Sequence, residues 1–282
     1  MKLSYRNQKN AQAISQFWGK PLNKPDWYKI EALSEDESEI MIYDVVGWPY
    51  NDASELVRNL NSIKTKTITV RINSPGGDVF DGIAIYNALK NHSSKVITRN
   101  EGLAASIASI IAMAGKEIQA YSNAMLMIHN AWTYAAGDAS LMREIADLLE
   151  QIDGNLLDIY VSQAKIGKKE TKAMMDAETW MTAKEAKEKG FIDTVLESGK
   201  ATKAQFDLSV FNNVPDDLLA NEASHKKPTE REIEKALRES GLSKNQAQAV
   251  LARGWKAICA DEAVIEAVKK TLEIIGGSQW KN

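Results

Sequence analysis

Two side chains in this sequence could together carry out nucleophilic chemistry. Ser106 lies in the run NEGLAASIASIIAMAG at residues 100–115, and His129 ends the apolar segment MLMIH. A serine hydroxyl is a poor nucleophile until a base removes its proton, and an acid must hold that base in the correct tautomer. Position alone leaves both open: Ser106 is a nucleophile or a small packing residue, and His129 is a base or a buried structural histidine.

The other two histidines are weaker candidates for a base. His92 lies in the polar segment NHSS and His225 lies in ASHKKP. Both are expected on the surface, because their neighbours are polar and follow no apolar strand pattern.

A tight turn at residues 74–78, with the sequence SPGGD, could hold a developing negative charge. The turn contains Ser74, Pro75, Gly76 and Gly77, and it lies between a strand-like and a helical segment. Glycines let backbone N–H groups approach a ligand closely, and the start of the helix that carries Ser106 offers further N–H groups to an oxyanion. The turn alone is not specific, because any tight strand-to-helix turn has a similar composition.

These candidate residues lie on a chain in which strands alternate with helices. Alternation of this length implies crossover connections and a largely parallel sheet, so the predicted fold class is α/β. Functional groups of such a sheet gather at one edge, where the segment before His129 ends. The predicted elements are two strands within 27–46, strands at 67–74, 95–100 and 124–130, and helices at 51–63, 78–91 and 104–114.

The second half of the chain is predicted to be more helical. A long amphipathic helix over 139–163 has an apolar stripe that projects beyond a compact domain or finds a partner. A short helix at 169–175 and a strand at 193–196 complete this unit, and two capping boxes, TERE and SKNQ, mark short helices further on. The predicted organisation is an N-terminal arm at 1–26, a main domain at 27–198, a linker at 199–228 and a helical tail at 229–282.

Composition argues against several other classes of protein. The 282 residues carry a formal net charge of -3 with a pI near 5.8, so attraction to nucleic acid or anionic lipid is not expected. The apolar run at 103–114 is shorter than a membrane span, and the first residues lack the apolar core of a secretory signal. With the single cysteine, Cys259, and no cluster of metal-ligand spacing, we expect a cytoplasmic protein with no metal and no cofactor.

Four segments taken together resemble the signature segments of the ClpP serine peptidase family. They are RINSPGGDVFDG, EGLAASIASIIAMAG, NAMLMIHNA and ETWMTAKEAKEKGFID, within residues 39–196. More narrowly, AETWMTAKEA and the tail segment TEREIEKALRESGLSKNQAQAVLARGWKA resemble the ClpP-related head maturation (prohead) proteases of tailed phages and prophages. The resemblance implies a ClpP/crotonase-like spiral of strand-strand-helix units, a protruding handle helix formed by residues 139–163, and a small C-terminal helical tail.

The resemblance also implies a role for individual residues. The family's nucleophile falls on Ser106, its general base on His129 and its acid on Glu178, where the family has aspartate; Asp176 is the alternative acid. The longer glutamate side chain changes the reach toward the imidazole. The family's oxyanion hole implies the backbone N–H groups of Gly77 and Ile107, with the turn formed by Ser74, Pro75 and Gly76 as their support.

The function implied is that of a serine endopeptidase in phage capsid assembly. It would cleave scaffold or capsid proteins as a homo-oligomeric ring, stacked on a second ring through the long helix, in the bacterial host cytoplasm or inside the assembling procapsid. The tail would dock on a capsid or portal partner. The alternatives are an ATPase-dependent ClpP-type housekeeping peptidase subunit, a largely structural capsid-assembly component, and a crotonase-type enzyme that holds a thioester oxyanion.

Overall fold

A mixed sheet of eight strands organises the described part of the chain. The computed structural model describes residues 27–47, 53–133, 135–197, 206, 208, 210–215, 218, 234, 235, 238 and 244. The strand order is β1-β2-β3-β4-β5-β8, and β6 pairs with both β4 and β7. The strands are β1 (Tyr28–Ala32), β2 (Glu37–Ile42), β3 (Thr67–Ser74), β4 (Lys95–Ala105), β5 (Glu117–Tyr121), β6 (Met125–Ile128), β7 (Thr179–Thr182) and β8 (Thr194–Leu196).

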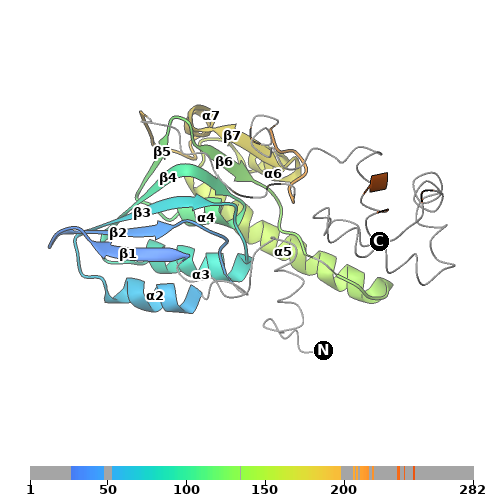
Figure 1. Ribbon diagram of the computed structural model, residues 1–282, viewed down its shortest axis with the longest axis horizontal. Helices are drawn as coiled ribbons and strands as arrows, with labels where there is room; N and C mark the ends of the chain where they lie inside the picture. Colours follow the sequence, from blue (N-terminus) through green and yellow to red (C-terminus); the bar gives the residue numbers. More distant parts are fainter. Residues whose placement is uncertain are drawn as a thin grey trace. The chain divides into compact units, whose positions relative to one another are not determined.

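Most of these strand pairs are parallel, as the alternation of strands and helices predicts. Only β1 with β2 and β6 with β7 are antiparallel among the described pairs. The helices are α2 (Ala53–Ser62), α3 (Val79–Lys90), α4 (Ile107–Ala112), α5 (Ala139–Gln163), α6 (Lys168–Asp176) and α7 (Ala183–Glu188). Figure 1 shows α2 and α3 along one face of the sheet, whereas α5 extends away from it. The mixed α/β fold class is confirmed.

The register of β3 against β4 places the glycine turn beside Ser106. Along β3 every second side chain is buried, and the apolar ones are the β-branched residues that fit a pleated surface. The pairing with β4 is regular up to Ile72, then shifts so that Ser74 lies opposite Ala104. This irregularity brings the end of β3 level with Ala104, two residues before Ser106.

The helix that was predicted over 104–114 begins later than expected. Ala104 and Ala105 belong to β4, and α4 starts only at Ile107. Residues 103–105 pair with β6, and the Ser106 N–H donates to the Met127 carbonyl at 3.1 Å. This ladder holds the segment extended despite its helix-forming alanines, so the prediction for these residues was wrong.

Two further elements were missed by the sequence analysis near the acidic candidates. Strand β7 and helix α7 form the segment TWMTAKEAKE. Helix α7 begins with a complete capping box, in which Thr182 and Glu185 each bond the other's backbone N–H. The spacing Thr-x-x-Glu was therefore a readable signal for this helix.

The long helix α5 has the predicted bounds and divides into two halves. Its buried residues, Ile152, Leu156, Leu157 and Tyr160, all lie in the second half, whereas Met142 and Leu148 in the first half are exposed. The first turn is capped by Asp138, whose side chain accepts from two backbone N–H groups. That this helix acts as a handle between rings stays a prediction.

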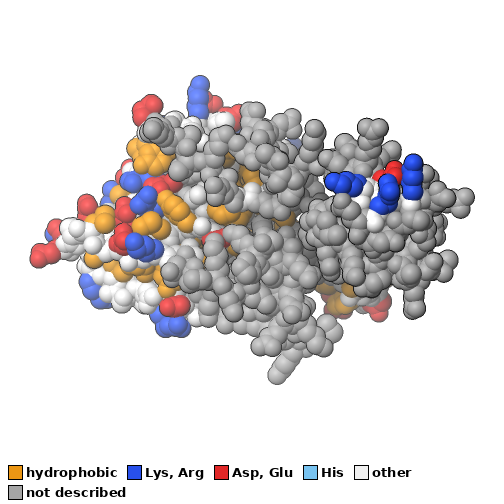
Figure 2. Space-filling model, in the orientation of Figure 1, with side chains coloured by type: hydrophobic (Ala, Val, Ile, Leu, Met, Phe, Trp, Pro, Cys, Tyr) orange, Lys and Arg blue, Asp and Glu red, His pale blue; other side chains and the backbone are white. Residues whose placement is uncertain are grey.

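The chain divides into two compact units, residues 1–215 and 216–282. The predicted N-terminal arm, the capping residues Thr229, Glu232, Ser243 and Gln246 of the two tail boxes, and Cys259 lie outside the described residues. In the part that is described, no helix is long and apolar enough to cross a membrane, and no three metal-ligating side chains cluster. On the face in Figure 2, charged side chains of both signs are interspersed with hydrophobic ones over the described residues.

Candidate active site

Ser106 and His129 meet at the ends of two neighbouring parallel strands. Ser106 follows β4 and His129 follows β6, and these strands pair directly through residues 103–105 and 125–127. The Ser106 Oγ lies 2.8 Å from the His129 Nε2, which is within hydrogen-bond distance. A hydroxyl and an imidazole in this arrangement can transfer a proton from oxygen to nitrogen.

The backbone of Ser106 is strained, with φ 54° and ψ −131°. Only Ser106 and Glu178 have a positive φ among the described residues other than glycine. Such a conformation costs of order 1–3 kcal/mol and persists where the surroundings impose it, often at functional sites. Here the pairing of β4 with β6 on one side and the start of α4 on the other impose a sharp turn at Ser106.

The glycine turn packs directly against Ser106. A Cβ added to Gly76, at φ 103°, would lie 2.6 Å from the Ser106 Cβ, and one added to Gly77 would lie 2.0 Å from the Val46 carbonyl oxygen. No other residue type fits at either position without movement of the backbone. The buried Ser74 supports the turn, because its Oγ donates to the Asp44 carbonyl at 2.6 Å and accepts from the Gly76 N–H at 3.2 Å.

Two backbone N–H groups are suited to the predicted oxyanion hole. The bridge between Val46 and the turn uses the Gly76 carbonyl and the Asp78 N–H, so the Gly77 N–H takes no part in it. Ile107 is the first residue of α4, and the N–H groups of a first helical turn have no partner within their helix. Both N–H groups lie near Ser106: Gly77 follows Gly76, which packs against Ser106, and Ile107 is the next residue after Ser106.

Burial keeps the imidazole of His129 neutral at neutral pH. Desolvation lowers the pKa of His129 from its ordinary value of 6.5 to about 4, against an opposing effect from the nearby Glu178 charge. A neutral imidazole can accept the Ser106 proton on Nε2 while Nδ1 carries its own proton toward Glu178. The burial therefore favours the protonation state that a general base needs.

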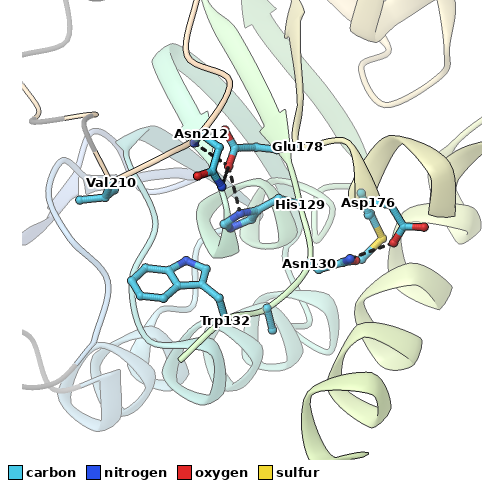
Figure 3. Close-up of a pocket in the computed structure, with 9 residues that line it drawn as sticks. His129, Asn130, Trp132, Asp176, Glu178, Val210 and Asn212 are labelled. Atoms are coloured by element: carbon cyan, nitrogen blue, oxygen red, sulfur yellow. Dashed lines mark hydrogen bonds and ion pairs between the residues drawn. The ribbon is translucent and has the colours of Figure 1, made fainter. Parts of the chain in front are cut away.

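The two acidic candidates have different surroundings. Glu178 is buried, and its Oε2 lies 3.9 Å from the His129 Nδ1. Asp176 is exposed instead, where its Oδ1 accepts from the Lys172 Nζ at 2.7 Å and from the Asn130 Nδ2 at 2.8 Å. Figure 3 shows Glu178 directed at the imidazole and Asp176 directed away from it. Of the two, Glu178 is the carboxylate adjacent to His129.

Sequence analysis missed the residues that cover this carboxylate. Leu208 and Phe211 are buried, and the Phe211 ring meets the His129 ring edge-on at 5.6 Å between centroids. Asn212 and Asn213 donate hydrogen bonds to Glu178. All four lie in the stretch that was predicted to be a linker, although the apolar residues of FDLSVFNN were a signal that part of it packs.

A second set of hydroxyls lies beneath Ser106. Ser109 Oγ donates to the Ser106 carbonyl at 2.6 Å and lies 2.7 Å from the Tyr160 hydroxyl. Because the one Ser109 proton is used on the carbonyl, Tyr160 is the donor of the second bond. Ser109 thereby links α5 to the strained residue.

A cavity of about 390 Å³ opens beside the imidazole. It is lined by apolar, amide and acidic groups from residues 129–132 after β6, from the end of α6 and Glu178, and from the segment around Asn212, as Figure 3 shows. A cavity of this size can hold one or two amino-acid side chains of a polypeptide. Its lining residues include His129, Asn130, Trp132, Met175, Glu178 and Val210.

Comparison with known proteins places the chain in a family. The profile of the Clp protease family matches residues 23–199. Because this match covers more than half of the chain, the chain belongs to the Clp protease family, which is a family of serine-type peptidases. The enzyme class predicted from the sequence is thereby confirmed at the level of the family.

Several curated relatives carry the name ATP-dependent Clp protease proteolytic subunit. The one from Bacteroides thetaiotaomicron is 38% identical over 133 residues, which is 46% of this chain and 60% of the relative. Subunit 1 from Protochlamydia amoebophila is 33% identical over 201 residues, which is 68% of this chain and 93% of the relative. The chain thus spans about three fifths of the first relative and nearly all of the second.

Proposed function

We propose that this chain is a serine endopeptidase with Ser106 as its nucleophile. The observation that carries the proposal is the 2.8 Å contact between the Ser106 Oγ and the His129 Nε2 at the end of two paired strands. His129 removes the hydroxyl proton as the oxygen attacks a peptide carbonyl, and it returns that proton to the leaving amine. Water then hydrolyses the acyl-enzyme by the same route.

Glu178 and two backbone N–H groups complete the proposed machinery. The buried Glu178 carboxylate stabilises the imidazolium that forms when His129 accepts the proton. Its 3.9 Å separation from Nδ1 is longer than a hydrogen bond, and catalytic contacts of this kind often tighten only when substrate binds. The Gly77 and Ile107 N–H groups bind the oxyanion of the tetrahedral intermediate.

For the biological role we propose head maturation in a tailed phage or prophage. The support is the resemblance of the AETWMTAKEA segment and of the tail to such proteases. The substrates would be scaffold or capsid proteins, cleaved by a homo-oligomeric ring in the host cytoplasm or inside the procapsid. The tail would dock the ring on a capsid or portal protein.

A second candidate role is a peptidase subunit that works with an ATPase. The names of the relatives favour it, since they describe ATP-dependent Clp protease subunits. Degradation of casein only when an unfoldase is added would support this second role. Cleavage of a co-expressed scaffold or capsid protein with no ATPase present would support head maturation.

The central experiment compares the wild-type protein with Ser106→Ala. We expect a fluorophosphonate probe to label the wild type at Ser106, with loss of fluoride, and to leave the variant unlabelled. Cleavage of casein should fall by at least about a thousandfold, because removal of a triad nucleophile leaves only binding and oxyanion stabilisation. Native mass spectrometry should report the same oligomer for both proteins. Proteolysis that persists in the variant would refute the proposal.

A further inference from the structure

The Glu178 carboxylate is held by a segment that lies outside the family match. Four donors surround it: the Asn212 backbone N–H at 3.1 Å, the Asn212 Nδ2 at 3.4 Å, the Asn213 backbone N–H at 2.7 Å and the Trp180 Nε1 at 3.4 Å. Three of these four come from residues 212 and 213, whereas the matched region ends at residue 199. We name Leu208, Phe211, Asn212 and Asn213 the acid clamp.

The acid clamp is packed into the molecule and does not merely touch the carboxylate. Leu208 and Phe211 are 4% and 7% exposed, which is the burial of core residues. The Phe211 ring lies edge-on both to the His129 ring and to the Trp180 ring, each at 5.6 Å between centroids. Apolar burial of two such side chains contributes several kcal/mol to keeping the segment in place.

A further contact ties the clamp to the backbone beside the acid. The Asn213 Nδ2 donates to the Ala177 carbonyl at 2.9 Å, one residue before Glu178. Glu178 itself has φ 48°, a conformation that a glutamate adopts only when its surroundings impose it. The clamp therefore restrains both the backbone that carries the carboxylate and the carboxylate itself.

Without such donors a glutamate at this position would be poorly placed. Its side chain has one more rotatable bond than aspartate, and a buried carboxylate without hydrogen-bond partners would turn toward water. Hydrogen bonds from two backbone N–H groups leave few orientations of the carboxylate open. With both oxygens engaged in this way, Oε2 still faces the His129 Nδ1 at 3.9 Å.

We propose that the acid clamp positions the triad acid: Asn212 and Asn213 hold the Glu178 carboxylate facing His129, and Phe211 closes the imidazole from water. This inference rests on the proposed function, because it assigns a role in the same triad. Asn212 and Asn213 act through Glu178, and Phe211 acts through His129. They are positioning residues, and none of them touches the reacting atoms.

The experiment measures the rate of fluorophosphonate labelling of the full chain across a series of pH values. Asn212→Asp places a like charge where an amide now donates to Glu178, and Asn213→Pro removes the 2.7 Å backbone donor. We expect each to lower the plateau rate about tenfold, as part of the hundredfold or more that general-base catalysis provides. Asn61→Asp adds the same charge on the exposed side of α2 and should leave the rate unchanged.

A double-variant comparison separates positioning from a general loss of structure. In a Glu178→Gln background, Asn212→Asp should change the labelling rate less than about twofold, because its effect acts through the missing charge. A tenfold loss that persists in that background would overturn the proposal. An unchanged labelling rate in both Asn212→Asp and Asn213→Pro would also overturn the proposal. A faster rate in both would overturn it too, because it would show that the clamp holds Glu178 away from His129.

The role of Phe211 has its own readout in the pH dependence of labelling. Labelling requires neutral His129, whose pKa burial lowers to about 4. Phe211→Ala admits water to the imidazole, so the acid limb of the profile should move upward toward pH 6.5, while Phe211→Leu keeps the cover and should restore most of the original midpoint. An unmoved midpoint in Phe211→Ala would refute this role.

Absence of labelling in the wild type would refute the proposed function itself and the clamp with it.

Discussion

Ser106 and His129 are held by paired strands of one sheet, whereas Glu178 is held by side chains and loop backbone from distant parts of the chain. Ser106 directly follows β4, and His129 directly follows β6. The last pair of residues between these two strands is Ala105 with Met127. Glu178 follows the end of α6 and depends on residues 211–213 for its hydrogen bonds and cover. The two halves of the site thus differ in what keeps them in place.

A strand ladder and a loop clamp respond differently to substitution. Backbone hydrogen bonds between β4 and β6 do not depend on side-chain identity, so the position of Ser106 relative to His129 is insensitive to most single changes nearby. The acid half depends on a few donors and two buried apolar side chains, each of which one substitution can remove. The acid half is therefore where the geometry of this site can be adjusted with least damage to the fold.

The largest expected effect within this comparison comes from replacing the acid. Glu178→Gln removes the charge that stabilises the imidazolium, so we expect the rate of casein cleavage to fall about a hundredfold to ten-thousandfold. The matched control is Asp176→Asn, which removes an exposed charge that lines the cavity but does not face the imidazole, so the rate should change less than about tenfold. If Asp176→Asn gave the larger loss, the acid would have to be reassigned.

The next effect concerns the base and the pH dependence of stability. Burial lowers the pKa of His129 from 6.5 to about 4. Between these values the unfolded chain binds a proton that the folded chain does not, so the free energy of unfolding decreases as the pH falls from 7 to 4. The loss amounts to about 3 kcal/mol at pH 4.

Urea unfolding at pH 7 and pH 4 can isolate this contribution. His129→Gln removes the titrating group, so the variant should lose about 3 kcal/mol less than the wild type over the same interval. The titration of the remaining groups is common to both proteins, so its contribution to the free energy of unfolding cancels in the difference. The same pH dependence in both proteins would show that burial does not depress the pKa of His129.

The smallest effect tests how firmly the sheet half holds Ser106. Tyr160→Phe removes the hydroxyl that donates to Ser109, whose own proton supports the Ser106 carbonyl. We expect a loss of about 1 kcal/mol in the free energy of unfolding and less than about a tenfold loss of activity. Tyr121→Phe, at a half-buried tyrosine on β5, serves as the control and should change neither. A hundredfold loss of activity in Tyr160→Phe would mean that the ladder alone does not hold the nucleophile.

Local patterns were enough to predict most of the sheet and to place Ser106 and His129 at one of its edges, whereas the roles proposed for these two residues came from the family resemblance. The β-branched run of β3, the stripe of α5 and the alternation between strands and helices lie close to their predicted bounds. The MLMIH segment placed His129 at the end of a strand, and parallel strands that end at one edge bring their next residues together. Where this reasoning failed, at Ala104 and Ala105, a neighbouring strand overrode the helical preference of alanine.

The acid half could not be predicted in the same way. Local residue patterns do not distinguish Asp176 from Glu178, because both precede β7 within three residues and both are acidic; only the family resemblance favoured Glu178. The two side chains point in different directions. The backbone turns at Glu178 so that its side chain is buried, whereas Asp176 is the last residue of α6 and its side chain is exposed. The clamp residues follow Glu178 by more than 30 positions, and contacts at that separation leave no periodic signal.

Residue order alone is enough for the α/β class, the family signature and the placement of a serine and a histidine at one sheet edge. Each depends on residue types repeated at the period of a strand or helix, or on a motif read within one segment. The folded chain shows in addition that Glu178 faces the imidazole, that Ser109 bonds the strained turn, and that Phe211, Asn212 and Asn213 lie at the site. These depend on where distant segments meet, which packing sets and no single segment encodes.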